Sequence, residues 1–158
     1  MKRFSITVCL LFLLYPWTVL AKEPLRTIIG TVTKVSDGDT IQVTDSLGTI
    51  VKVRLYGIDA PETTKRYRKT GAITKQGQPY GEEAYLALRQ KVKLQKVRCD
   101  VLDIDKYRRL VAIVWLDGRD INRGMIAEGH AWAYRKYLRS PQASDYIAAE
   151  EQAKKDRK

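Results

Sequence analysis

The stretch TIQVTDSLGTIVKVRL, residues 40–55, carries the clearest structural pattern in this sequence. Residues 40–44 alternate between polar and apolar side chains, and residues 51–55 alternate apolar side chains with Lys52 and Arg54. A period of two is typical of half-buried β-strands, and the Asp-Ser-Leu-Gly segment between the two runs is a turn signal. The stretch therefore predicts a β-hairpin with one apolar face and one face that carries cations.

Further strands are predicted on both sides of this hairpin. Val32 and Val35 precede the turn Asp-Gly-Asp at residues 37–39, and residues 92–99 and 109–115 are two more strand candidates. Five short strands with a helix after the third are typical of a small closed barrel of the oligonucleotide-binding (OB-fold) type. The pattern predicts an α+β fold, mainly β, in a single domain.

Three helices are predicted around the strands. The first covers residues 81–91. The second covers residues 120–129, with Asp120 as a good N-cap and Gly129 as a good C-cap. The third covers residues 140–153 and opens with Ser-Pro, a cap followed by proline at the first helical position.

The composition limits the chemistry and indicates the partner. The chain has 29 Lys plus Arg against 18 Asp plus Glu, a net charge of +11, and one histidine, His130. A single imidazole excludes a His-Cys zinc cluster, a paired-histidine phosphodiesterase and an HExxH metalloprotease. A strongly basic domain favours a polyanion such as nucleic acid as its partner.

Residues 1–21 have the layout of a secretory signal peptide: a charged start, a short apolar run and small or branched residues before Ala21. We expect cleavage after Ala21, which leaves residues 22–158 with a net charge of +9 in the periplasm or outside the cell, without stable membrane association. The alternative is an uncleaved N-terminal anchor, although the run is short for a membrane span. Cys9 leaves with the signal, so Cys99 has no partner and is expected to be buried.

A basic insert occupies residues 63–79 and includes Lys65, Arg68 and Lys69. It has no periodic apolar stripe, which predicts a loop. Two interpretations remain open at this point: a solvated surface loop, or an arm that contacts the phosphates of a nucleic acid.

Carboxylates and arginines cluster in short motifs that follow one another along the chain. They are D-G-D-T at residues 37–40, R-x-x-x-I-D-x-P-E at 54–62, Y-G-E-E-A at 80–84 and D-K-Y-x-R at 105–109. In this order and spacing they resemble the staphylococcal nuclease (thermonuclease) family, over nearly all of the chain that follows the signal. The resemblance implies a five-stranded OB-fold barrel with three helices, and a monomeric, calcium-dependent enzyme that cuts DNA and RNA.

The resemblance also assigns roles, position by position. The calcium ligands would be Asp39, Asp59 and the carbonyl of Ala60. The catalytic residues would be Arg54, Arg109 and Glu62, the last as general base. The nucleic-acid contacts would be Lys106, Tyr107 and Tyr137, with Lys65, Arg68 and Lys69 of the basic insert in addition. In one departure from the staphylococcal enzyme, Arg108 replaces a glycine, and the register into the last strand favours Arg109 over Arg108 as the phosphate contact.

These residue types suit the hydrolysis of an anionic diester. Calcium prefers oxygen ligands, a carboxylate can accept a proton from water, and guanidinium groups match the charged oxygens of the transition state. Two other functions are compatible with a basic barrel: binding of nucleic acid without cutting it, and binding of anionic lipid or glycan by a cationic envelope protein. All five charged site residues are present together, which favours the enzyme.

Overall fold

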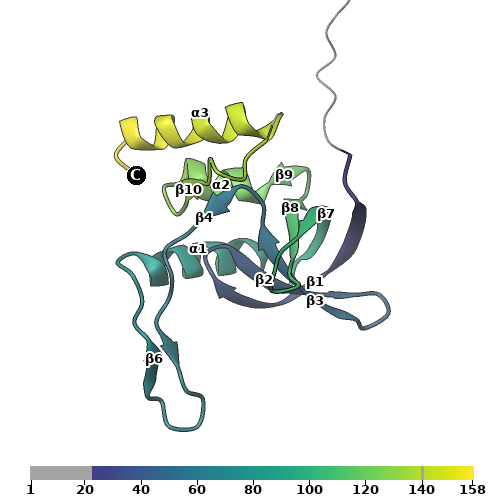
Figure 1. Ribbon diagram of the computed structural model, residues 1–158, viewed down its shortest axis with the longest axis vertical. Coiled ribbons are helices and arrows are strands. Elements are labelled where there is room, and N and C mark those ends of the chain that lie inside the picture. The colour runs from purple at the N-terminus through teal and green to yellow at the C-terminus, as the bar shows by residue number, and fades with distance from the viewer. Residues whose placement is uncertain (1–22, 140) are drawn as a thin grey trace, which may run out of the picture.

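The computed structural model describes residues 23–139 and 141–158; the predicted signal peptide, with its cleavage site at Ala21, and Ser140 lie outside the described residues. Ten strands and three helices follow one another along the described chain (Figure 1). Their bounds are β1 Arg26–Asp37, β2 Thr40–Asp45, β3 Ile50–Leu55, β4 Ile58–Asp59, β5 Lys65–Arg66, β6 Ile73–Lys75, α1 Gly81–Val92, β7 Lys96–Ile104, β8 Leu110–Leu116, β9 Arg119–Asp120, α2 Ile121–Ala127, β10 Trp132–Ala133 and α3 Gln142–Lys155.

Five strands form a closed barrel in the order β3-β2-β1-β7-β8. Neighbouring strands in this order are antiparallel, and the barrel closes by parallel pairing of β3 with β8, where Val53 lies opposite Leu110. The long strand β1 pairs with both β2 and β7, and two register shifts bend it. The predicted fold, a mainly β, five-stranded OB-fold barrel with three helices, is confirmed.

The barrel interior is filled by the apolar positions of the alternating strands. Val53 and Leu55, on the apolar face of the predicted hairpin, are at most 1% exposed, and Cys99 is buried and unpaired as expected. Helix α1 packs against β1 through Ala84, Leu88 and Val92, which recur every four residues on one face of the helix.

Several predicted boundaries differ from the structure, and two of the differences have a clear physical reason. Residues 92–99 were expected as one strand, but Val92 completes the buried stripe of α1, and β7 begins only at Lys96 after a turn with Leu94 at φ 63°. The third helix was expected to end at Ala153, but α3 continues to Lys155, where Lys154 forms an ion pair with Glu150.

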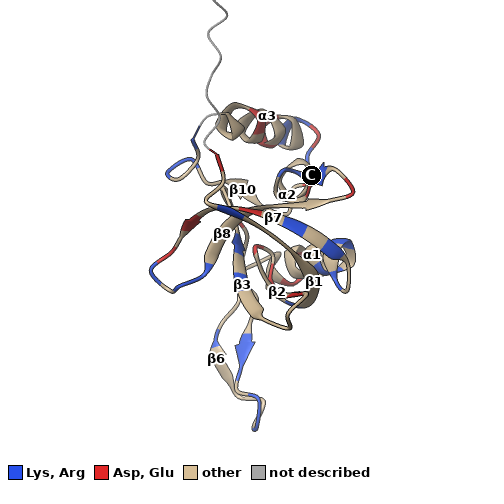
Figure 2. Ribbon diagram, turned by 90° about the vertical axis from the view of Figure 1, so that its right-hand side faces the viewer, with Lys and Arg blue, Asp and Glu red and all other residues tan. Residues whose placement is uncertain are grey.

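Residues 63–79, which we call the arm, were predicted to be a loop, and that prediction is wrong. β5 and β6 pair in a small antiparallel sheet, with Lys65 opposite Lys75 and Arg66 opposite Ile73. The arm projects from the barrel (Figure 1), and Lys and Arg recur along it (Figure 2). Backbone pairing rather than apolar packing forms this hairpin, so it leaves no hydrophobic period in the sequence.

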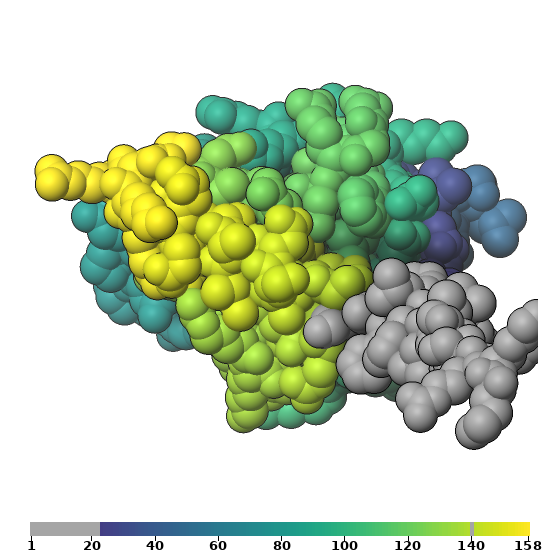
Figure 3. All heavy atoms as spheres, turned by 90° about the horizontal axis from the view of Figure 1, so that it is seen from above, coloured from purple at the N-terminus to yellow at the C-terminus, as the bar shows by residue number. Residues whose placement is uncertain are grey.

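Helices α2 and α3 cover one end of the barrel. Asp120 caps α2 as predicted, because its side chain accepts a hydrogen bond from the Arg123 amide at 3.0 Å; Gly129 follows the helix at φ 79°. Helix α3 packs on α2 and forms the upper surface of the molecule (Figure 3). The hydroxyl of Tyr146, on α3, donates to Asp120 at 2.8 Å.

The side chain of Asn122, on α2, is fully buried and links three backbone segments. It donates to the carbonyls of Tyr56 and Ala112 and accepts from the Val114 amide, each at 3.0 Å. It thereby ties the chain just after Arg54 to β8. Within the described part of the chain, no helix has the length and apolar character that a membrane span requires.

Candidate active site

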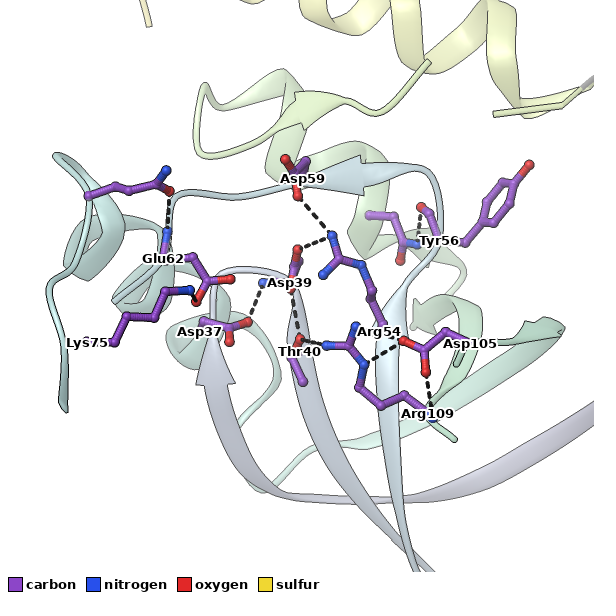
Figure 4. Close-up of polar contacts among 12 residues, drawn as sticks. Asp37, Asp39, Thr40, Arg54, Tyr56, Asp59, Glu62, Lys75, Asp105 and Arg109 are labelled. Carbon is purple, nitrogen blue, oxygen red and sulfur yellow. Dashed lines mark hydrogen bonds and ion pairs between the residues drawn. The ribbon is translucent and has the colours of Figure 1, made fainter. Parts of the chain in front are cut away.

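Arg54 joins two aspartates that come from different elements of the fold (Figure 4). Its Nη2 lies 3.0 Å from Oδ2 of Asp39 and 2.9 Å from Oδ1 of Asp59. Asp39 lies in the turn between β1 and β2, Arg54 is next to last in β3, and Asp59 ends β4. Because Nη2 of Arg54 contacts both carboxylates, Oδ2 of Asp39 and Oδ1 of Asp59 must lie close together, less than twice the length of a hydrogen bond apart.

The turn that carries Asp39 is packed tightly in place. A Cβ on Gly38 would lie 2.7 Å from Cβ of Ala60 and 2.8 Å from Cβ of Ala84, so only glycine fits between the segment after β4 and α1. The Leu55 amide donates to the Asp39 carbonyl at 2.8 Å, and the Thr40 hydroxyl donates to Oδ1 of Asp39, also at 2.8 Å. The predicted ligands Asp39, Asp59 and Ala60 therefore lie in one neighbourhood.

Asp39 is an electrostatically costly carboxylate, since its side chain is only 6% exposed. Burial raises its pKa to about 7; the positive charge of Arg54 opposes this increase, and the negative charge of Asp37 adds to it. The charge of Arg54 does not offset the loss of hydration of the Asp39 carboxylate, which lies beside the charge of Asp37. A further positive charge beside Asp39 would stabilise its ionised form.

Arg109 approaches the same centre from the other side of the barrel seam. Its Nε and Nη2 each lie 2.7 Å from Oδ2 of Asp105, and Nη1 donates to the Thr40 hydroxyl at 3.5 Å (Figure 4). Thr40 in turn donates to Asp39. Arg108 is exposed at φ 61°. Of the two arginines, Arg109 is the one that contacts the centre around Asp39.

A cavity of about 620 Å³ adjoins the two arginines, and we call it the first cavity. Its walls include both arginines and all three predicted nucleic-acid contacts outside the arm: Arg54, Arg109, Lys106, Tyr107 and Tyr137. Tyr107 and Tyr137 are 68% and 53% exposed. Exposed rings among cations are suited to stack on nucleobases while the cations contact phosphates.

Glu62 lies after β4, and residues at the end of the arm and the start of α1 hold its backbone. The Glu62 amide donates to Oε1 of Gln78 at 2.8 Å, and the Gln78 amide donates to the Glu62 carbonyl, also at 2.8 Å. A Cβ on Gly81 would clash with the Glu62 carbonyl, so the start of α1 presses directly on this segment. The Glu62 carboxylate is partly exposed and lies 3.3 Å from Nζ of Lys75, on β6.

The donors around Asp39 fit a hard divalent cation. The carboxylates of Asp39 and Asp59 lie within reach of a shared ion, and that of Asp39 is buried. Ala60, whose backbone carbonyl is the third predicted ligand, directly follows Asp59. Among residues 23–139 and 141–158, no group of three or more His, Cys, Asp and Glu side chains could hold a metal. Calcium at this position would need water and phosphate oxygens to complete its coordination.

The three arm cations that were predicted to contact nucleic acid do not line the first cavity beside Arg54 and Arg109. Lys65 lies at the base of the arm, where Nζ contacts Oδ2 of Asp37 at 3.2 Å and donates to the Thr63 hydroxyl at 3.0 Å. Arg68 and Lys69 are exposed in the turn at the arm's tip. Neither lines the first cavity.

Several residues that shape the site were not selected from the sequence. Asp105 anchors Arg109, Thr40 connects Arg109 to Asp39, and Gln78 holds Glu62. Asp105 and Thr40 lie inside the quoted motifs, but the contacts they make form only when the turn at 105–109 folds and β8 lies beside the other barrel strands. Gln78 had no signal in the sequence, because it contacts Glu62 only through the folding of the arm.

Sequence similarity to known proteins identifies the family of this chain. The family described as staphylococcal nuclease homologue matches residues 52–158. An uncharacterized endonuclease of Haemophilus influenzae is 32% identical over 146 residues, which cover 92% of this chain and 73% of that protein. Protein ParB of Escherichia coli is 35% identical over 131 residues (77% of this chain, 66% of that protein), and a micrococcal nuclease of Shigella flexneri is 33% identical over 126 residues (74% and 64%). The chain belongs to the staphylococcal nuclease family.

Proposed function

We propose that this protein is a calcium-dependent nuclease that hydrolyses phosphodiester bonds in DNA and RNA with little sequence preference. The observation that carries the proposal is that two arginines, one on each side of the barrel seam, are connected to the buried Asp39. Arg54 contacts Asp39 and Asp59 directly, and Arg109 reaches Asp39 through the Thr40 hydroxyl. Membership in the staphylococcal nuclease family supports it.

The absence of sequence preference follows from the kinds of group around the first cavity. Guanidinium and ammonium groups contact phosphates, which are the same in every nucleotide. Tyrosine rings stack on any base, because every base has a π-face. Tyr107 and Tyr137 stand beside Lys106 and the two arginines in this cavity.

Asp39 and Asp59 would hold the calcium ion, together with the carbonyl of Ala60. When bound, calcium supplies Lewis acidity to the phosphate and to water. The raised pKa of the buried Asp39 supports this assignment, since an added cation favours the ionised carboxylate.

The remaining steps belong to the chain's own side chains. Glu62 would accept a proton from the water that attacks phosphorus. Arg54 and Arg109 would donate hydrogen bonds to the phosphate oxygens, on which negative charge accumulates as the bond to O5′ breaks. Because the bond to O5′ breaks, the phosphate stays on the 3′ oxygen, and the departing O5′ takes up a proton from water to give a 5′-hydroxyl end.

Digestion of heat-denatured DNA and of RNA by the purified protein tests the proposal. We expect cleavage with millimolar calcium, no cleavage with chelator, and loss of cleavage in a Glu62→Ala variant that still binds the substrate. Tight binding with no cleavage in calcium, magnesium or manganese would instead identify a nucleic-acid-binding barrel. Cleavage that persists in chelator would exclude the calcium role.

We also propose that the protein is exported and processed after Ala21. The first described tertiary hydrogen bond is donated by the Leu25 amide to the Val101 carbonyl, at 2.7 Å. A cut after Ala21 would therefore leave this contact and the whole of β1 in the product. N-terminal sequencing of protein recovered from the periplasm or the medium should start at Lys22, and an intact Met1 would contradict the proposal.

A further inference from the structure

A second cavity, of about 580 Å³, lies next to the segment that carries Glu62. Its walls come from four places: Pro61 before Glu62, Tyr80 and Glu83 at the start of α1, residues 128–132 from the end of α2 into β10, and Arg157 and Lys158 after α3. We call it the second cavity. The proposed catalytic mechanism uses none of its side chains.

Trp132 forms one wall of the second cavity and lies directly beside Asp59. The two residues are register partners in the antiparallel pair β4–β10. Side chains directly opposite each other in such a pair project from the same face of the sheet. The indole is 54% exposed. An exposed aromatic ring is therefore held next to a proposed calcium ligand, and the rest of the cavity extends beyond it.

Tyr80 forms another wall, and its backbone is held in an unusual conformation. Its φ is 64°, in the left-handed region that bulky residues rarely adopt, and its side chain is 75% exposed. The Ala84 amide donates to the Tyr80 carbonyl at 3.0 Å, and the next residue, Gly81, packs against the Glu62 carbonyl. Backbone strain of this kind persists where the surrounding structure enforces it, often at ligand sites.

The charges around the second cavity do not select a phosphate. Glu83 and Glu128 line it together with Arg157 and Lys158, and Glu128 is further neutralised by Lys91 at 2.6 Å. The first cavity, by contrast, has four cations of the site on its walls, Arg54, Lys106, Arg109 and Arg139, against two aspartates. A near-neutral cavity with two exposed aromatic rings is suited to a flat, uncharged ring.

The two cavities lie at successive points along one short segment. Gly57 and Ile58 line the first cavity and Pro61 lines the second, with Asp59 between them. Three residues of extended chain span at most about 10 Å. A polynucleotide whose phosphate contacts Arg54 would thus have a nucleoside on each side, one at each cavity.

From these observations we propose that the second cavity binds the nucleobase across the scissile phosphate from the one in the first cavity, by stacking on Trp132 and Tyr80. The inference rests on the proposed nuclease function and adds a specific subsite to it. An OB fold commonly contacts about 4–16 nucleotides of single strand, which is more than one cavity can accommodate.

Substrates with a single cleavable linkage test the proposal. One oligonucleotide is intact, and two others carry an abasic residue on the 5′ or the 3′ side of that linkage. We expect Trp132→Ala to lower kcat/KM on the intact substrate by about 5- to 100-fold, the range for loss of one stacked base. The variant should have almost no further effect on one of the two abasic substrates, and Tyr137→Ala should show the same pattern with the other.

Two controls separate stacking from a structural effect. Trp132→Phe retains a ring and should retain most of the activity, while both Trp132 variants should keep the wild-type Tm. Equal losses on the intact and both abasic substrates, or no loss on the intact one, would overturn the proposal.

A binding measurement distinguishes failure of the subsite from failure of the nuclease function. In chelator, a Trp17→Phe, Trp115→Phe double variant retains Trp132 as its one tryptophan, and single-stranded oligonucleotide should quench its fluorescence. Quenching without cleavage in any metal would refute the nuclease and retain the subsite. Binding detected by anisotropy without a change in this fluorescence would refute the subsite alone.

Discussion

Gln78 holds Glu62 by two hydrogen bonds to its backbone. The amide of Glu62 donates to the side-chain oxygen of Gln78, and the amide of Gln78 donates to the carbonyl of Glu62, both at 2.8 Å. These bonds fix the point where the chain leaves β4 and enters the arm. The position of the proposed general base therefore depends on a residue sixteen positions later in the sequence, near the C-terminal end of the arm.

We predict that Gln78→Ala lowers kcat by about tenfold with little change in KM. The substitution removes one of the two hydrogen bonds, worth about 1 kcal/mol, and lets the Glu62 segment move. Gln78 does not line either cavity, so substrate binding should be spared. Steady-state kinetics on single-stranded DNA measures the effect. Gln90→Ala, on the exposed face of α1, is the matched control and should behave as wild type.

Arg109→Ala should lower kcat by about 10²–10³, because it removes a proposed phosphate donor that Asp105 already holds in place. Arg108→Ala removes the same charge from the next residue and should stay within about threefold of wild type, since that side chain is exposed. Parallel digestion assays compare the two variants. Equal losses in both would mean that net charge rather than the position of Arg109 matters.

The arm should contribute to binding through its tip rather than through its base. Replacing Arg68 and Lys69 together with serine should reduce the slope of log K against log[salt] by about 1.4, as expected for two phosphate contacts on single strands. Lys34 and Lys96, exposed on β1 and β7, provide a charge-matched double variant that should leave the slope unchanged. Titrations at several salt concentrations measure both. An unchanged slope in the first variant would exclude the tip from the interface.

Asn122→Ala should reduce the free energy of unfolding by about 3 kcal/mol. The side chain is fully buried, and its loss strands the Val114 amide and the Tyr56 carbonyl away from water. Urea denaturation measures the change. Gln152→Ala, whose side chain bonds Asp156 on the exposed face of α3, should cost less than about 0.5 kcal/mol. Comparable losses would contradict a special role for Asn122.

Glu150 should make stability depend on acid pH. Burial disfavours its charged form, but hydrogen bonds from Arg135, Lys154 and the Ala133 amide outweigh burial and lower its pKa below the ordinary value of 4.5. A lowered pKa stabilises the fold above pH 4.5, and this stabilisation is lost as the pH falls through the folded-state value.

Glu150→Gln should therefore cost about 1–2 kcal/mol at pH 7, and the difference from wild type should shrink as the pH is lowered below 4.5. Thermal unfolding at a series of pH values gives this difference. Glu151→Gln, at a 53% exposed neighbour that contacts the same two cations, is the control and should show little effect at any pH. A pH-independent gap would indicate lost packing rather than lost charge.

The barrel was predictable because its strands obey a simple rule. Val53 and Leu55 alternate with Lys52 and Arg54, and the structure buries the first pair while it leaves Lys52 exposed. The first helix was also predicted, over residues 81–91. The structure extends it by one residue to Val92, which is part of its buried face. Periodicity identifies an element better than it identifies where that element ends.

The arm and the holding of Glu62 were not predictable in this way. β5 and β6 are short and exposed, and they pair through backbone groups that every residue has. The contact between Gln78 and Glu62 depends on that pairing. The bridging of Asp39 and Asp59 by Arg54, and the link from Arg109 to Asp39 through Thr40, likewise depend on tertiary geometry that the motifs alone do not give.

The parallel pairing of β3 with β8 has a consequence for the order of events as the chain folds. Val53 meets Leu110 across the seam, and the two are separated by α1, the arm and β7. Such non-local pairing is slow to form, because the entropy of closing a long loop is lost before the contact is gained. Arg54 lies on one side of the seam and Arg109 on the other. A chain that has folded its first three strands therefore holds one of the two arginines proposed to bind phosphate, and hydrolytic competence should appear only with barrel closure.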